Sequence, residues 1–167
     1  MEYKASLDNL AKLITIGTFV LLLFLGYKSV ISLMHSQGER NIILFQSGKL
    51  LLFVAIIIGS YIFAPQSYKV DSLELTIVRP IKNRIIQLTD ISEILILEKG
   101  RFAGGIRTFG VGGLFGYFGK YYYPKIGHVS LYATQGKNKI LIYTKDGKKF
   151  MITPDDLSII DELNKKF

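Results

Sequence analysis

The sequence predicts an α+β protein in which a two-helix transmembrane hairpin precedes a domain of about seven antiparallel strands closed by a C-terminal helix. Three observations predict this arrangement. Two long apolar runs lie in the N-terminal third, short β-branched and aromatic runs separated by turn residues follow them, and the chain ends in an amphipathic helical pattern. We therefore divide the chain into a hairpin over residues 1–65 and a strand-rich domain over residues 66–167.

The two apolar runs predict helices over about residues 10–34 and 42–64. Residues 13–27 carry no charge, and neither do residues 50–68. Each helix is long enough to cross the roughly 30 Å of hydrocarbon in a bilayer. Residues 35–41 are polar and predict a short turn. The helices would then run antiparallel, which places the N-terminus and the domain on the same side of the membrane.

The N-terminal third allows three other interpretations. Residues 1–34 could be a signal peptide, both runs could be buried helices of a soluble protein, or only one run could span. No small-x-small cleavage site follows the first run, and a second apolar run comes directly after it. We therefore adopt two spans. The flanking positive charges are balanced and leave the orientation open: Lys4, Lys12 and Lys69 on one side, against Lys28, Arg40 and Lys49 on the other.

Short runs rich in β-branched and aromatic residues predict the strands of the domain. Their ranges are 68–70, 73–78, 84–88, 94–98, 128–133, 140–144 and 149–152. Residues 89–92 predict a single turn capped by Asp90, with Glu93 three residues further on. Asp146-Gly147 predicts a tight hairpin between the last two strands.

The end of the chain predicts a helix that begins at Thr153. Thr153 is a suitable N-cap, Pro154 suits the first helical position, and two acidic residues follow where the helix dipole is positive. Three apolar residues would share one face of this helix: Leu157, Ile160 and Leu163.

Residues 99–145 contain no Asp or Glu but eight Lys or Arg. The first half of this stretch mixes glycine, aromatic rings and positive charge, and it predicts a long connection between strands. Its rings would pack on the domain or contact a membrane surface or a partner, because aromatic and basic side chains favour the bilayer interface. Glycines at every third position could also admit a second backbone. A nucleotide or nucleic-acid site is disfavoured, because Gly119-Lys120 lacks the Ser or Thr of a phosphate-binding loop.

The candidate contact residues for a membrane or a partner are aromatic and basic. They are Arg101, Arg107, Phe109, Phe115, Tyr117, Phe118, Lys120, Tyr121, Tyr122, Tyr123 and Lys125.

No catalytic, cofactor or metal site is predicted. The chain has no cysteine, which excludes disulfides, thiolate metal sites and a cysteine nucleophile. Its two histidines, His35 and His128, lie in different segments. No nucleophile motif surrounds a Ser or Thr, so we expect a protein that is not an enzyme.

Two segments resemble parts of the bacterial pleckstrin-homology-like (PH-like) domains. Residues 84–97 are similar to their strand–turn–strand unit around Asp90-Ile91, and residues 142–155 are similar to their last hairpin leading into the C-terminal helix. The order of the predicted elements over about residues 66–166 matches as well. The resemblance implies a PH-like barrel or sandwich that binds or assembles. One departure concerns the first hairpin, which carries only Lys69 and Arg79 where phosphoinositide-binding PH domains concentrate positive charge.

The sequence thus predicts a membrane-anchored, non-enzymatic PH-like module that binds or scaffolds. Its partners would be the lipid bilayer, anionic lipid included, or another membrane protein. The alternatives are a homo-oligomeric assembly protein and the anchoring subunit of an enzyme or transport complex. The resemblance implies the inner (cytoplasmic) membrane of a bacterium, with the C-terminal domain in the cytoplasm.

Overall fold

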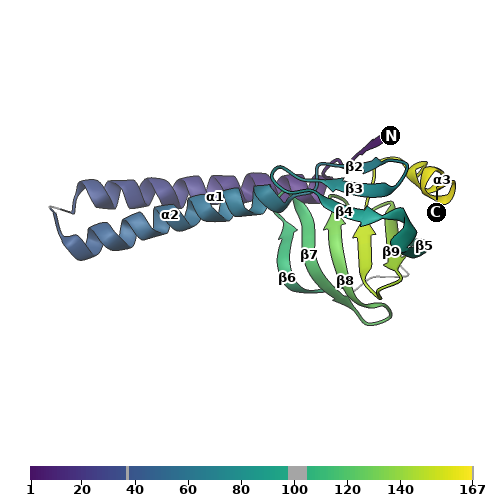
Figure 1. Cartoon of the computed structure of the whole chain (residues 1–167). Helices are drawn as coiled ribbons and strands as arrows, with labels where there is room; N and C mark the ends of the chain where they lie inside the picture. The colour runs from purple at the N-terminus through teal and green to yellow at the C-terminus, as the bar shows by residue number, and fades with distance from the viewer. Residues whose placement is uncertain (37, 98–104, 167) are drawn as a thin grey trace.

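The computed structural model describes residues 1–36, 38–97 and 105–166. Two long helices, α1 (Asn9–Met34) and α2 (Arg40–Phe63), lie side by side and project from a compact β domain (Figure 1). Both predicted helices are confirmed to within two residues at each end.

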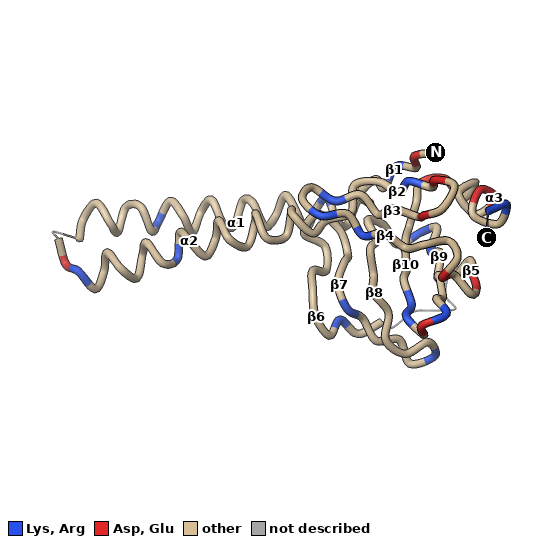
Figure 2. The backbone as a smooth tube through the Cα atoms, viewed as in Figure 1, with Lys and Arg blue, Asp and Glu red and all other residues tan. Residues whose placement is uncertain are grey.

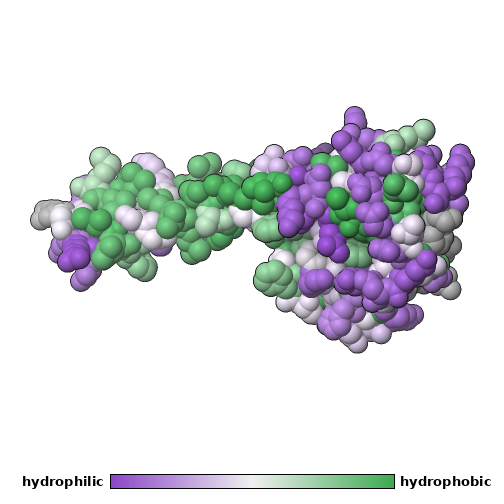
Figure 3. Space-filling model, in the orientation of Figure 1, coloured by the Kyte–Doolittle hydropathy of each residue, from purple (hydrophilic) through white to green (hydrophobic). Residues whose placement is uncertain are grey.

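The surface of both helices is apolar and open. The most hydrophobic 18-residue windows of α1 and α2 are only 6% and 0% buried, so neither is a core helix within this chain. Figure 3 shows apolar side chains along the projecting pair and hydrophilic ones at its far end. Both helices are long and apolar enough to cross a membrane.

Small and polar side chains bring the two helices together. A side chain at Gly26 would meet Leu50 at 3.7 Å, and Gln46 Nε2 donates to Ser32 Oγ at 3.0 Å. Close approach at small residues and interhelical hydrogen bonds are typical of helix pairs in lipid.

The first sheet has the order β1-β2-β3-β4 and is antiparallel. Its strands are β1 (Glu2–Lys4), β2 (Ser67–Val70), β3 (Glu74–Val78) and β4 (Arg84–Gln87). The sequence did not predict β1, which pairs Tyr3 with Tyr68. This pairing confirms that the N-terminus and the domain lie at the same end of the helices.

The second sheet has the order β5-β9-β10-β8-β7-β6. Its strands are β5 (Ile91–Leu97), β6 (Ile106–Gly113), β7 (Gly116–Tyr123), β8 (Gly127–Ala133), β9 (Lys139–Thr144) and β10 (Lys149–Ile152). All seven predicted strands are present in the two sheets, and β6 and β7 join β1 as strands that the sequence did not predict. Interpreting the glycine-rich stretch as a long connection was therefore wrong over residues 106–123, which form a β-hairpin. One pair, β8 with β10, is parallel rather than antiparallel.

The core lies on both faces of the central strands. Alternate residues of β8, β9 and β10 enter two different hydrophobic clusters, with Ile140 and Ile142 in one and Leu141 in the other. Tyr68 is fully buried in the first cluster, where its hydroxyl donates to Tyr132 O at 2.7 Å and accepts from Thr153 N at 3.2 Å.

The C-terminal helix α3 (Ile159–Asn164) begins five residues later than predicted, and its N-cap is Ser158 rather than Thr153. Residues 153–155 are held extended by contacts distant in sequence: Thr153 Oγ1 accepts from Thr134 N, and Asp155 N donates to Lys4 O. The buried face of α3 accordingly consists of Ile159 and Leu163 rather than Leu157, which is exposed.

The turn predicted over residues 89–92 is also corrected. A 3₁₀ helix, η1 (Leu88–Asp90), forms one residue earlier, and no side-chain hydrogen bond caps it. Asp90 instead accepts a hydrogen bond from Lys145 N at its carbonyl oxygen, and β5 starts at the next residue. The contact with the β9–β10 turn therefore replaces the local cap.

Candidate functional site at the junction of helices and domain

Paired glycines build the β6–β7 hairpin. Gly110 lies opposite Gly119, and both have φ near +120°, a conformation that only glycine adopts readily. A Cβ at Gly110 would lie 2.2 Å from Phe118 O, and one at Gly119 would lie 2.3 Å from Phe109 O. The glycines do admit a second backbone, but that backbone is the neighbouring strand of the same chain.

The tip of this hairpin docks on the two helices. Phe115, at the turn, has φ +57° and donates its backbone N–H to Thr15 Oγ1 of α1 at 3.0 Å. Its ring packs edge-on against Phe19 of α1 at 5.9 Å and Tyr61 of α2 at 5.5 Å between centroids. Edge-to-face pairs of this kind each contribute about 0.5–1.5 kcal/mol beyond the area they bury.

Asp8 joins three elements beside the docked tip. Its Oδ1 caps α1 by accepting from Ala11 N at 2.7 Å and also accepts from the Tyr117 hydroxyl at 3.2 Å. Its Oδ2 accepts from Gly136 N, in the β8–β9 connection, at 3.0 Å. One carboxylate thus ties the start of α1 to β7 and to the next loop, which fixes the domain relative to the helices.

Tyrosines of the hairpin have raised pKa values. Burial, followed by the charge of Asp8, raises the pKa of Tyr117 to about 12. Burial also raises the pKa values of Tyr121 and Tyr123. The protonated phenol of Tyr117 is the form that donates to Asp8, so this contact depends on pH.

We expect the Tyr117 contact to be lost at high pH. A pKa near 12 in the folded chain, against about 10 when unfolded, gives a stabilisation that is complete below pH 10 and disappears as pH rises through 12. Between these values the free energy of unfolding should fall more steeply for the native chain than for Tyr117→Phe. Chemical denaturation at several pH values measures both slopes, and parallel curves would contradict the contact.

The structure separates the candidate contact residues into groups. Phe115 and Tyr117 lie at the docked tip, whereas Tyr121 and Tyr123 are buried in the second hydrophobic cluster of the domain, as the packing alternative expected. Phe118 is buried as well, on the side of the hairpin that meets α2. The remaining described candidates are exposed: Arg107, Phe109, Lys120, Tyr122 and Lys125. Arg101 lies outside the described residues.

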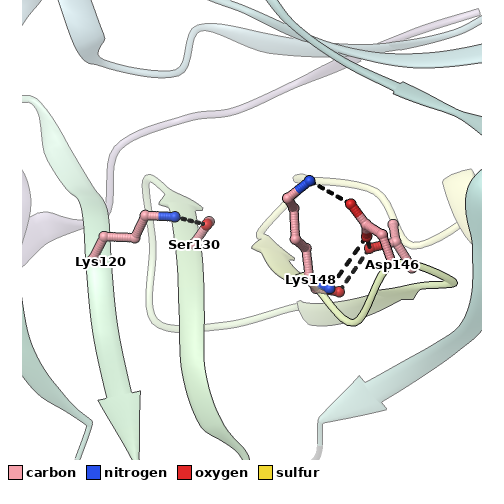
Figure 4. Close-up of polar contacts among 5 residues, drawn as sticks. Lys120, Ser130, Asp146 and Lys148 are labelled. Atoms are coloured by element: carbon pink, nitrogen blue, oxygen red, sulfur yellow. Dashed lines mark hydrogen bonds and ion pairs between the residues drawn. The ribbon is translucent and has the colours of Figure 1, made fainter.

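The basic candidates differ in their distance from the tip. Arg107 is six residues before Gly113 along β6, but its guanidinium folds along the strand to Gly112, where a Cβ would lie 2.8 Å from its Nη1. Lys125 follows the far end of β7. Lys120 Nζ donates to Ser130 Oγ on the adjacent strand at 2.7 Å, while Lys148 pairs with Asp146 in a separate turn (Figure 4). Of the described basic candidates, Arg107 therefore brings its charge beside the docked tip, whereas Lys125 stands at the opposite end of the hairpin.

Sequence reasoning missed a second basic segment, the connection between β3 and β4. It contains Arg79 and Lys82, and Arg84 opens β4. β2 starts only four residues after α2 ends, so the start of β2 lies close to the helices. β3 is antiparallel to β2 and therefore returns the chain to the same place. Lys and Arg residues gather there, at the junction of the helices and the domain (Figure 2). Ile81, between them, is 71% exposed. The short spacing between α2 and β2 was the signal available in the sequence.

The domain contains a small sheet, a larger sheet and a C-terminal helix, and a comparison of the sequence with models of protein families agrees with this fold. A family model described as a bacterial PH domain matches residues 66–167, more than half of the chain. The chain belongs to the bacterial PH domain family. Comparisons with curated proteins and with solved structures found no match. PH domains are generally non-enzymatic modules that bind lipids or proteins, and the two helices that are long and apolar enough to cross a membrane fit a membrane-anchored module of this kind.

The first hairpin of this bacterial PH domain points away from the helices. Its turn, residues 71–73, lies at the end opposite the α2–β2 junction, where Lys166 Nζ of the C-terminal segment donates to Asp71 O. Asp71 lies in the turn, Glu74 follows it, and Lys166 is itself paired with Glu162, so acidic side chains surround the one ammonium that reaches the turn. This hairpin therefore lacks the concentration of Lys and Arg that marks a phosphoinositide site of the eukaryotic kind.

Proposed function

We propose that the chain is a membrane-anchored, non-enzymatic scaffold whose PH domain is held against the anionic headgroups of the membrane in which α1 and α2 are inserted. One observation carries this proposal: the β6–β7 tip is docked between the helices through Phe115, so the domain has one fixed orientation at the base of the hairpin. A domain on a loose linker would have no preferred membrane-facing surface.

The β3–β4 connection is the segment of the domain best placed to contact lipid. Its basic residues stand where the chain returns to the end of α2, and exposed Ile81 lies among them. Each basic side chain beside anionic lipid contributes about 1 kcal/mol, and an exposed isoleucine can enter the interface. The candidate contact Lys125, at the far end of the hairpin, is better placed to attract an acidic partner protein.

Hydrogen–deuterium exchange of the full chain in nanodiscs tests this contact. We expect the amides of residues 81–84 to exchange several-fold more slowly in phosphatidylglycerol than in phosphatidylcholine. The difference should vanish in 1 M salt, where the Debye length is about 3 Å. The amides of Lys125 and Ile126, at the far end of the hairpin, serve as the internal control. Equal exchange of residues 81–84 in the two lipids would contradict the proposal.

A second candidate function, homo-oligomeric assembly, is supported by the edge strand β6. Among the described residues β6 pairs only with β7, and it exposes Ile106 at 63% and Phe109 at 79%. An open edge with apolar side chains can pair with another strand. In the same experiment, protection of residues 107–109 that grows with the number of chains per nanodisc would favour assembly.

We further propose that the domain faces the cytoplasm of a bacterium and that the helices span its inner membrane. The abundance of Lys and Arg in the domain supports a cytoplasmic location. The cytoplasmic orientation expected of membrane-anchored PH-like proteins supports it as well. Because the chain has no cysteine, single substitutions Glu39→Cys and Lys137→Cys give clean labels. An impermeant thiol reagent should label only the first in intact cells, and labelling of only the second would reverse the orientation.

A further inference from the structure

An apolar groove of about 480 Å³ lies between the last turns of α2 and the face of the β6–β7 hairpin that carries Phe118. One wall is formed by Ala55, Ile56 and Gly59 of α2, and the other by Phe109, Val111 and Phe118. Gly59 has no atom within 4 Å of a built Cβ, so the groove is open at this point. Gly110 and Gly119 of the hairpin also line the groove, and because they have no side chains they leave space on the sheet side.

Arg79 is the only charged residue among those that line the groove. Its guanidinium carbon lies 5.9 Å from the ring centre of Phe63 and 5.7 Å from that of Tyr132, which holds it in place by cation–π contacts. The Nε atom of Arg79 is buried and has no hydrogen-bond partner among the described residues. No carboxylate of the described residues forms an ion pair with Arg79 either. A buried donor of this kind is costly unless an acceptor satisfies it.

The groove has a polarity that matches a phospholipid. Arg79 stacks on Phe63, the last residue of α2, at the domain end of the groove. Ala55 lies eight residues earlier, about 12 Å further along the helix toward the apolar part of the pair. A lipid entering from the bilayer would lay an acyl chain along the apolar wall and place its phosphate at the arginine, since a guanidinium binds phosphate oxygens in a bidentate manner.

We propose that this groove binds one membrane phospholipid, with its acyl chain between α2 and the β6–β7 hairpin and its phosphate on Arg79. The inference rests on the proposed membrane anchoring but not on the contact of residues 81–84 with the lipid surface. The site is distinct from the first hairpin of the PH domain, and its ligand comes from the plane of the membrane rather than from solution.

Native mass spectrometry of the full chain in detergent tests the site, with added phosphatidylglycerol as the probe. We expect one retained lipid per chain, whose affinity falls about tenfold or more in Arg79→Gln because a charge-assisted pair is lost. Gly59→Leu should abolish retention by filling the groove, and the open space at this helical position lets the variant fold. Dioleoylglycerol, which lacks the phosphate, should bind more weakly, and free glycerophosphate should not compete.

Two matched controls locate the effect. Lys12→Gln removes one positive charge from an exposed position of α1 that does not line the groove, and Gly48→Leu adds the same side chain at another open position of α2. Both should retain the lipid as the native chain does. Unchanged retention in Arg79→Gln and Gly59→Leu would overturn the site. An equal loss in Lys12→Gln would also overturn it, because binding would then be diffuse attraction to the basic surface.

Discussion

Replacing Gly110 with valine is expected to break the β6–β7 hairpin and release the domain from the helices. The new side chain would require a φ of +120° and would place its Cβ 2.2 Å from Phe118 O and 2.8 Å from the Cα of Gly119. Backbone strain of about 1–3 kcal/mol and overpacking of similar size combine to a loss of roughly 2–5 kcal/mol. Thermal unfolding of the full chain followed by circular dichroism measures the effect.

Gly17→Val is the matched control for this experiment. Gly17 lies in α1, and a built Cβ meets no atom within 4 Å there. The control should unfold within a few degrees of the native chain. A Gly110→Val variant as stable as the control would mean that the two strands do not approach as closely as the structure shows.

Replacing Asp8 with alanine is expected to cost about 2–4 kcal/mol. The change removes an N-cap, worth about 0.5–2 kcal/mol, together with two hydrogen bonds to a charged acceptor, from Tyr117 and from Gly136. Thermal unfolding measures the total, and hydrogen exchange of residues 134–138 should increase locally. Asp8→Asn, which keeps an acceptor oxygen, should lose less.

Asp161→Ala provides the comparison for Asp8→Ala. Asp161 is exposed, and its side chain forms no hydrogen bond with a described residue. Its removal should change stability by less than about 0.5 kcal/mol. Equal losses in the two variants would show that Asp8 is an ordinary surface charge and not the link between α1, β7 and the β8–β9 connection.

The helices and most strands could be predicted because their signals are local. Residues 13–27 and 50–64 lack charge over a length that fits a bilayer, and runs such as residues 140–144 combine β-branched residues with flanking turns. Their identity does not depend on contacts elsewhere in the chain. The predicted bounds of α1 and α2 accordingly agree with the structure within two residues.

Elements that depend on distant partners were missed. Glycine ordinarily argues against a strand, and the role of Gly110 becomes visible only when Gly119 lies opposite it. β1 has three residues, and its partner β2 lies more than sixty residues away. At Thr153 the local cap signal is strong, but Thr134 and Tyr68 hold this residue extended.

The candidate site was predicted in part. The aromatic composition of residues 109–123 identified a segment that does reach the helices, through Phe115 and Tyr117. The basic residues of the same stretch were grouped with them because they are near in sequence, whereas the hairpin carries Lys125 to its far end and only the Arg107 guanidinium reaches Gly112, beside the tip. Arg79 was overlooked because its groove is formed by α2 and the hairpin, which no local pattern brings together.

The docking of the hairpin tip on the helices can be tested most directly by photo-crosslinking from position 115. Benzoylphenylalanine in place of Phe115 keeps an aromatic ring at the tip, and irradiation of the full chain in membranes should join it to α1 and α2 of the same chain. Mass spectrometry should then locate the crosslinks in the peptides that contain Phe19 and Tyr61. Crosslinks only to lipid or to a second protein chain would contradict the docked arrangement and the fixed orientation of the PH domain.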